Sequence, residues 1–205
     1  MKICILSHPR SGSSYIQQLL ALYYNLENLE EVFTNMSVTD GIQHLSVTDD
    51  FVVKIICHNL PELNLNDLNL HTYDKIVVVE RKNLLETFIS WAAAQHTNRW
   101  YKNTQAEQFT LDKRTFVKNS HHMNYFWQMK DFLINNNIIF DHVYYEDIEQ
   151  DIVKCFIDMN LDPIKAADLP TKWETSVWDY RTDCLNYNKV DKWVTDYIQW
   201  KKDNI

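Results

Sequence analysis

The sequence predicts an α/β fold of three layers, in which helices flank a short central parallel sheet. Short runs of β-branched residues alternate with longer helical segments. The run at residues 75–79 (KIVVV) is continuously β-branched after its first residue, as in parallel strands that are buried on both faces. The chain has 205 residues, of which 45% are hydrophobic, which is enough for the core of one domain over residues 1–205.

Hydrophobic patterning places the elements along the chain. Apolar runs predict strands at residues 2–7, 51–57, 75–79 and 138–145. Helical spacing of apolar residues predicts helices at residues 15–24, 83–95, 116–135, 148–159 and 190–201, with Asn83 as an N-cap. Pro163 and Pro170 mark a loop region, and no repeat or linker indicates a domain boundary.

The charge balance disfavours a nucleic-acid partner. The chain carries 20 Lys and Arg against 28 Asp and Glu, a formal net charge of −8. The negative electrostatic field of such a chain repels a polyanion. An anionic ligand must therefore be captured by a local, preorganised site.

The cysteines indicate a reducing compartment. Cys4, Cys57, Cys155 and Cys184 are scattered without a CxxC pair, which favours free thiols over disulfides. The first residues lead straight into a strand rather than into a signal peptide. No run reaches the roughly 18 apolar residues that a membrane span needs. We therefore expect a cytoplasmic protein without a membrane span.

The segment between the first strand and the first helix is a candidate anion site. Residues 8–14 read HPRSGSS. Backbone N–H groups and the helix dipole converge at such a position and favour a phosphate-like group. Gly12, one of two glycines, lets the backbone approach a ligand, and Arg10 supplies a fixed charge. Hydroxyl donors are available from Ser11, Ser13 and Ser14. The alternative is a serine-rich turn that only caps the helix.

The loop differs from the Walker A pattern GxxxxGK[ST], although its strand–loop–helix setting makes the predicted domain P-loop-like. Ser13 stands where that pattern has Lys, and the charge of Arg10 comes two residues before Gly12. The Walker A Lys contacts the nucleotide phosphates, and the following Ser or Thr binds Mg²⁺. A kinase or an ATPase is therefore disfavoured.

A second candidate lies at the end of the third predicted strand. Arg81 stands at the carboxyl edge, where open α/β sheets bind ligands. Ser90 falls about two turns into the following helix. An Arg and a Ser together suit a terminal phosphate, because Arg gives charge-assisted donors and Ser a neutral one. The alternative is an exposed Arg near a strand end and a buried Ser in a helix.

These two segments carry a resemblance to a known family. Residues 8–20 (HPRSGSSYIQQLL) resemble the 5′-phosphosulfate-binding loop of sulfotransferases, commonly PRSGST or PKSGTT. Residues 81–85 (RKNLL) with Ser90 resemble the 3′-phosphate-binding segment of that family. The resemblance implies 3′-phosphoadenosine 5′-phosphosulfate (PAPS) as donor and 3′-phosphoadenosine 5′-phosphate (PAP) as product. It assigns cofactor binding to Arg10, Ser11, Gly12, Ser13, Ser14, Tyr15, Arg81 and Ser90.

Later segments extend the resemblance in chain order. Residues 90–100 (SWAAAQHTNRW) are similar to the bacterial sugar-sulfotransferase branch, and residues 145–148 (YEDI) resemble the family's YEDL segment. Residues 179–181 (DYR) and 186–187 (NY) are similar to the C-terminal pattern of that branch. The chain is thus identified as a member of the sulfotransferase family, with the bacterial sugar branch as the nearest pattern.

The resemblance also implies catalytic roles. Sulfuryl transfer to a hydroxyl needs positive groups where negative charge develops and a base for the acceptor proton, and we expect no metal. Arg10 stands at the position that helps the sulfuryl group leave, and Lys54 is a further candidate. Glu31 matches the Glu-x-Phe position that carries the base in the sugar branch, and Glu30 and His58 are the alternatives.

The acceptor is left open among sugar, lipid-linked glycan, peptide and small phenol, with sugar preferred by the resemblance. Aromatic side chains that either line its pocket or belong to the core are Trp91, Trp100, Tyr101, Phe126 and Trp127. Because the chain is short for the family, the acceptor region is either reduced or completed by a homodimer partner. Tyr180 and Arg181 are the candidates for contacts with adenine.

Two other functions fit parts of the pattern. A P-loop nucleotide or sugar kinase relative would bind ATP with Mg²⁺, and the missing Lys-Ser/Thr pair counts against it. A noncatalytic phosphonucleotide-binding protein would keep Arg10, Arg81 and Ser90 but would not need Glu31.

Overall fold

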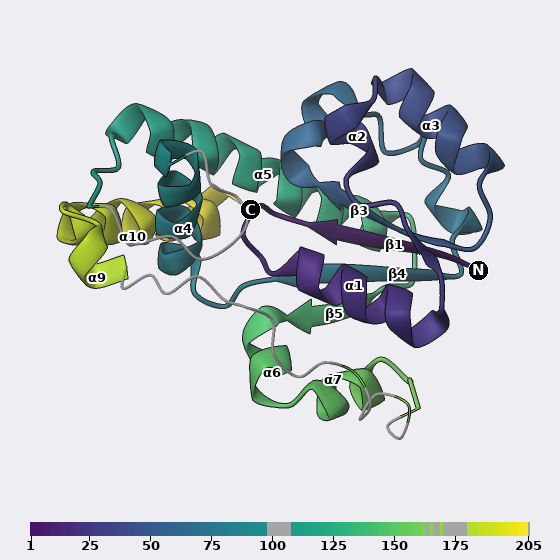
Figure 1. Cartoon of the computed structure of the whole chain (residues 1–205). Helices are drawn as coiled ribbons and strands as arrows, with labels where there is room; N and C mark the ends of the chain where they lie inside the picture. The colour runs from purple at the N-terminus through teal and green to yellow at the C-terminus, as the bar shows by residue number, and fades with distance from the viewer. Residues whose placement is uncertain (98–107, 163–164, 166–168, 170–179, 205) are drawn as a thin grey trace. The chain divides into compact units, whose positions relative to one another are not determined.

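The computed structural model describes residues 1–97, 108–162, 165, 169 and 180–204. Within them, five strands form one parallel sheet in the order β2-β3-β1-β4-β5 (Figure 1). The strands are β1 (Lys2–Ser7), β2 (Glu27–Asn28), β3 (Phe51–Ile56), β4 (Lys75–Glu80) and β5 (Asp141–Tyr144). The predicted α/β fold with a central parallel sheet flanked by helices is confirmed.

The chain divides into two compact units. One comprises Met1–Lys82 with His122–Lys172 and contains the sheet, and the other comprises Asn83–His121 with Trp173–Ile205. Helix α5 (Lys113–Asn135) contributes its first part to the second unit and its remainder to the first. The expectation of a single domain over residues 1–205 stays a prediction.

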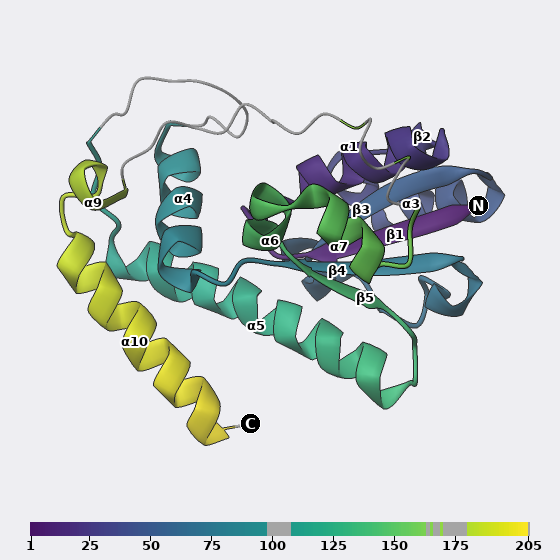
Figure 2. The same cartoon turned by 90° about the horizontal axis from the view of Figure 1, so that it is seen from below.

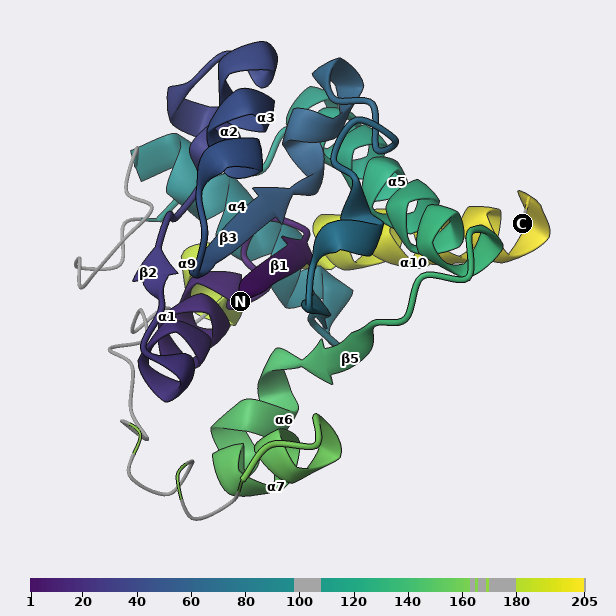
Figure 3. The ribbon, with the colours of Figure 1, turned by 90° about the vertical axis from the view of Figure 1, so that its right-hand side faces the viewer.

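Helices cover both faces of the sheet in the first unit. Its helices are α1 (Ser13–Tyr24), α2 (Val32–Asn35), α3 (Val38–Val47), α6 (Tyr145–Gln150) and α7 (Ile152–Asp158), with two 3₁₀ turns, η1 (Cys57–Glu62) and η2 (Leu70–Thr72). One face packs against α1, α6 and α7, through a core that includes Ile5, Leu20 and Phe156. Figure 3 shows these three helices on one side of the sheet, with α2, α3 and residues 122–135 of α5 on the other, and Figure 2 shows α1 and α5 on opposite sides.

The register of the central strands brings three chain segments to one edge. Ser7, the last residue of β1, pairs with Ile56 at the end of β3 and with Val79 near the end of β4. The residues that follow these strands therefore begin at the same carboxyl edge of the sheet. In a parallel sheet this edge is where ligands bind.

Most predicted elements are confirmed, with differences at their ends. The third and fourth predicted strands are β4 and β5, but β5 is shorter than the predicted 138–145 because only Asp141–Tyr144 pairs with β4. The predicted helix 148–159 is two helices, because the Asp151 side chain accepts a hydrogen bond from the N–H of Lys154 (2.9 Å) and starts α7 there. The short elements β2, α2 and α3 were not predicted.

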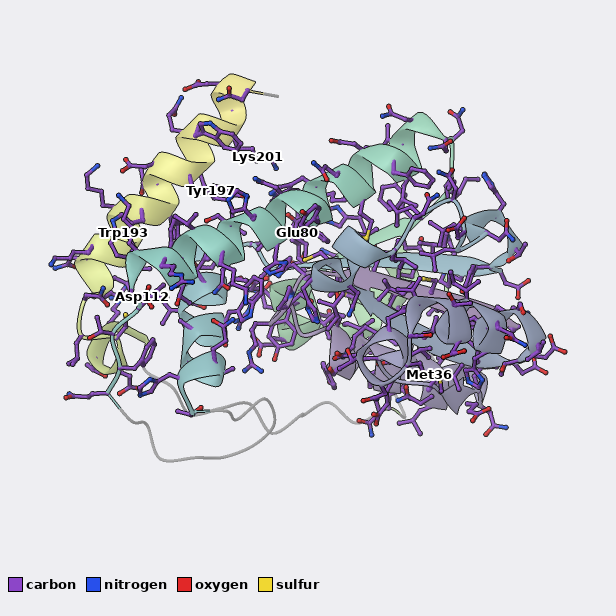
Figure 4. The ribbon with its side chains drawn as sticks, turned by 90° about the horizontal axis from the view of Figure 1, so that it is seen from above. Met36, Glu80, Asp112, Trp193, Tyr197 and Lys201 are labelled. Atoms are coloured by element: carbon purple, nitrogen blue, oxygen red, sulfur yellow. The ribbon has the colours of Figure 1, made fainter. Side chains whose placement is uncertain are left out.

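The second unit is helical and has an aromatic core. It contains α4 (Leu84–Thr97), the first part of α5, α9 (Tyr180–Asp183) and α10 (Tyr187–Asn204). Trp193 and Tyr197 of α10, both labelled in Figure 4, contact Phe116 and Phe88 respectively. Asn83 accepts a hydrogen bond from the N–H of Glu86 (3.2 Å), as the predicted N-cap requires.

All four cysteines are buried and unpaired, so the prediction of free thiols is confirmed. Across the described residues, none of the helices combines the length and the apolar character that crossing a membrane would take. The predicted loop around Pro163 and Pro170 lies outside the described residues.

A buried carboxylate ties β4 to β5 and α5. Glu80, labelled in Figure 4, accepts hydrogen bonds from Lys130 (2.7 Å) and from His142 (2.9 Å). Burial acts to raise the pKa of Glu80, but the bonds from His142 and Lys130 outweigh it, so this pKa lies below its ordinary value. A carboxyl group with a lowered pKa in the folded state stabilises the fold above its unfolded pKa and loses that effect as the pH falls.

We expect Glu80→Gln to lower the free energy of unfolding by about 3 kcal/mol at neutral pH, because it leaves Lys130 without its buried partner. The deficit should begin to shrink below the ordinary Glu pKa of 4.5, where the carboxyl group of the unfolded wild type becomes protonated, and it should disappear once the pH has fallen through the lower pKa of the folded state. Denaturant unfolding at neutral pH and at pH values around and below 4.5 measures the loss of stability and its dependence on pH. Asp131→Asn removes an exposed carboxylate from the next position of α5 and is the control. An equal deficit at pH values above and below 4.5 would contradict the argument.

Candidate functional site

The loop between β1 and α1 has an unusual backbone conformation at two of its residues. Arg10 and Gly12 both adopt left-handed conformations, with φ of 61° and 80°. Gly12 is the N-cap residue of α1, and it provides no side-chain cap. The first turn of α1 therefore directs its N–H groups to the carboxyl edge of the sheet without a capping side chain, which is the arrangement that favours an anion.

The three predicted serines of this loop differ in their surroundings. Ser13 is buried, and its hydroxyl accepts a hydrogen bond from Ser7 (3.0 Å). Ser11 is fully buried, and in the described part of the chain its hydroxyl has no hydrogen-bond partner. Ser14 is half-buried and accepts a hydrogen bond from Lys54 (2.5 Å). Ser14 is thus the most accessible of the three residues.

Lys54 joins this loop to the predicted base. Its ammonium lies 2.8 Å from a carboxylate oxygen of Glu31, and it is the same group that donates to Ser14. Only 3% of the Lys54 side chain and 18% of the Glu31 side chain are exposed. The second Glu31 oxygen accepts a hydrogen bond from Thr34 (3.0 Å). Lys54 was predicted as a further candidate for helping the sulfuryl group leave, but no feature of the sequence indicated that it pairs with Glu31.

The two alternative bases are placed differently. Glu30 is exposed, and its backbone carbonyl, rather than its carboxylate, holds neighbouring groups: the N–H of Lys54 (3.0 Å) and the amide of Gln17 (3.2 Å). His58 lies in η1, and its ring is 6.3 Å from that of His122. Glu31 is thus the candidate base whose carboxylate is linked to the anion loop.

His8 connects the loop to the end of β4. This side chain is fully buried, with one ring nitrogen, Nδ1, 2.9 Å from the carbonyl oxygen of Pro9. The other nitrogen, Nε2, accepts a hydrogen bond from the backbone N–H of Arg81 (3.2 Å). The ring also packs edge-on against Phe126, at 5.1 Å between centroids. Phe126 is itself fully buried, so it belongs to the core.

Tyr145 fills the space between the loop and Arg81. A Cβ atom on Gly12 would lie 2.0 Å from Cδ2 of the Tyr145 ring, so only glycine permits this packing. The Arg81 guanidinium carbon is 5.2 Å from the centroid of the same ring. Gly12 and Arg81, which come from the two predicted ligand segments, thus contact one aromatic side chain.

The two acidic residues after Tyr145 contact the segment that directly follows β4. Glu146 lies 4.0 Å from Nε of Arg81 and accepts a hydrogen bond from the backbone N–H of Lys82 (3.1 Å). Asp147 pairs with the ammonium of Lys82. The YED sequence therefore orients the Arg81–Lys82 segment, a role that the sequence pattern alone did not reveal.

The remaining predicted residues fall into three groups. Tyr15 lies in the first turn of α1 and is buried in the core, and Trp91 and Ser90 are buried in α4 of the second unit. That Ser90 and Arg81 bind the same phosphate stays a prediction. Arg181 is exposed in α9, which also contains Tyr180. Trp100 and Tyr101 lie outside the described residues.

One of three comparisons with known proteins identifies the fold. No protein family model matches the chain, and no curated protein matches it significantly by sequence. Among solved structures, the chain is similar to a mouse sulfotransferase, SULT7A1, that was crystallised in complex with PAP. The match has a TM-score of 0.61 at 13% identity and covers 100% of this chain and 85% of the mouse chain. The chain therefore has a sulfotransferase fold.

The contact between Gly12 and Tyr145 can be tested by a double-mutant cycle. We expect Gly12→Ala to cost about 3 kcal/mol of stability, because a Cβ adds a clash with the ring to the strain of a positive φ. In a Tyr145→Ala background the same change should cost about 1 kcal/mol, since only the backbone strain is left. Denaturant unfolding of the four proteins measures the coupling. Equal costs in both backgrounds would show that the ring does not constrain Gly12.

Proposed function

We propose that the chain is a sulfotransferase that transfers a sulfuryl group from PAPS to an acceptor hydroxyl. One observation carries the proposal: α1 begins without a side-chain cap at the carboxyl edge of the sheet, and the buried ammonium of Lys54 contacts Ser14 in its first turn. Backbone donors and a local positive charge together suit a doubly charged phosphate ester. The likeness to a sulfotransferase crystallised with PAP supports the choice of ligand.

The ligand residues would divide between the two ends of the nucleotide. Arg10, the backbone of residues 11–14 and Lys54 would hold the 5′-phosphosulfate, and Arg81 with Ser90 would hold the 3′-phosphate. PAPS would supply an activated sulfuryl group. The bond from sulfur to the 5′-phosphate oxygen breaks as the acceptor oxygen attacks, and Arg10 would stabilise the charge that develops on the leaving phosphate.

Glu31 is the residue we assign as general base. Lys54 and Thr34 hold the Glu31 carboxylate in place, and only the Lys54 side chain separates it from the loop. Glu30, in contrast, is exposed. A base must reach the acceptor proton while the donor is bound in the loop. The link from Glu31 through Lys54 to Ser14 supports this assignment over Glu30.

The finer features of the proposal rest on the sequence resemblance. We infer a carbohydrate acceptor, as in the bacterial sugar branch, and a cytoplasmic enzyme whose free thiols suit a reducing compartment. A homodimer partner that contributes to the acceptor site is part of the same inference. A kinase relative is the second candidate, and its ligand would be ATP with Mg²⁺.

Calorimetric titration with PAP and with ATP·Mg²⁺ tests the ligand. We expect PAP to bind and ATP·Mg²⁺ to bind much more weakly. Arg81→Ala should weaken PAP binding by at least about tenfold, because it removes a charge-assisted contact to the 3′-phosphate. A preference for ATP·Mg²⁺ would favour the kinase relative, and binding of neither ligand would overturn the proposal.

Glu31→Gln and Glu30→Gln form a matched pair for the base. Glu31→Gln should lower kcat by about 100-fold or more, because a general base contributes to the chemical step. PAP affinity should not fall, because the Lys54 ammonium keeps its positive charge. Glu30→Gln should leave kcat within about twofold, since its carboxylate is exposed. Turnover of PAPS to PAP with a sugar acceptor is the measurement. If Glu30→Gln abolishes turnover and Glu31→Gln does not, the two roles are reversed. If neither variant changes turnover, His58→Asn is the next variant to measure.

A further inference from the structure

The hydrogen bonds of His8 determine its tautomer. The Arg81 backbone N–H can only donate, so Nε2 of His8 must be the acceptor and carry no proton. The Pro9 carbonyl can only accept, so Nδ1 must carry the proton and donate it. Each ring nitrogen therefore has one partner, and both bonds are satisfied only by the neutral ring with its proton on Nδ1.

The surroundings keep this ring neutral. Burial lowers the pKa of His8 to about 4, against opposing effects of the Pro9 carbonyl, Glu80 and Glu146, while Arg81 acts in the same direction as burial. On the α5 side the ring meets the apolar Phe126. A protonated ring would place a second N–H against the N–H of Arg81 and break the connection.

We propose that His8 is a positioning residue that fixes the distance between the 5′-phosphosulfate loop and the 3′-phosphate segment. The inference rests on the proposed function. His8 links the carbonyl of Pro9, directly before Arg10, to the amide of Arg81, so the two cationic residues are joined through one rigid, buried ring. A nucleotide that carries both phosphates gains from a fixed distance between its two sites, because the second contact then forms without a further ordering cost.

Nucleotides with one or two phosphates separate this role from a general effect on folding. The probes are PAP, adenosine 5′-monophosphate and adenosine 3′-monophosphate. We expect His8→Phe, which retains a ring against Phe126, to weaken PAP binding by about tenfold and each monophosphate by less than about twofold. Titration calorimetry measures the affinities, and thermal unfolding checks that the variant is folded.

Two amide variants refine the test. His8→Gln can still present an acceptor oxygen toward the Arg81 N–H, so it should recover part of the PAP affinity. His8→Asn reaches only the Pro9 carbonyl and should behave like His8→Phe. If His8→Phe weakens all three nucleotides alike, or leaves PAP binding unchanged, the positioning role is wrong and the proposed function stands. If the wild-type protein binds none of the three nucleotides, the proposed function fails and this inference fails with it.

A spectroscopic measurement tests the geometry independently of any ligand. Nitrogen-15 NMR of the wild-type protein should show His8 with its proton on Nδ1 from about pH 6 to about pH 8. An imidazolium, or a proton on Nε2, would overturn the hydrogen-bond assignment on which the proposal depends.

Discussion

The packing of Tyr145 against Gly12 is the constraint on which the site depends. It demands a residue without a side chain at the start of α1, and Gly12 also has the positive φ that this loop requires. The guanidinium of Arg81 lies over the same ring. One aromatic side chain, carried by α6 directly after β5, therefore shapes both the anion loop and the neighbouring cation. Such contacts connect loops that follow different strands of the open sheet.

An acidic protein would need local means to bind an anion, and the carboxylates of the candidate site lie beside its cations. Lys54 is paired with Glu31, Arg81 lies near Glu146, and Lys82 is paired with Asp147. Each pairing restricts a long, flexible side chain and so reduces the ordering cost that a ligand would otherwise meet. The carboxylates also offset the positive charge before the ligand arrives. The pairings therefore order the cations of the candidate site without making this edge of the sheet strongly basic.

The sequence predicted the sheet well because buried parallel strands have a simple signature. The runs at residues 2–7 and 75–79 are apolar on both faces, and the structure places them side by side at the centre of the sheet. The turn at Asp151 was missed because the apolar pattern continues across it, while a single side-chain cap ends one helix and starts the next. Composition gives no sign of such contacts. The same holds for His8, which resembles an ordinary loop residue until the strand register brings it to Arg81.

The route by which positive charge reaches the loop distinguishes this chain from a Walker A protein. In the Walker A pattern the lysine belongs to the loop and its helix, directly after the last glycine. Here Ser13 occupies that position, and an ammonium reaches Ser14 from Lys54 in the middle of the neighbouring strand β3. Because Lys54 is also bonded to Glu31, the cation is coupled to the candidate base rather than to the loop alone. Positive charge and candidate base thus meet through a single side chain, which is the arrangement that the proposed transfer to a hydroxyl would require: stabilisation of the leaving group on one side and removal of a proton on the other.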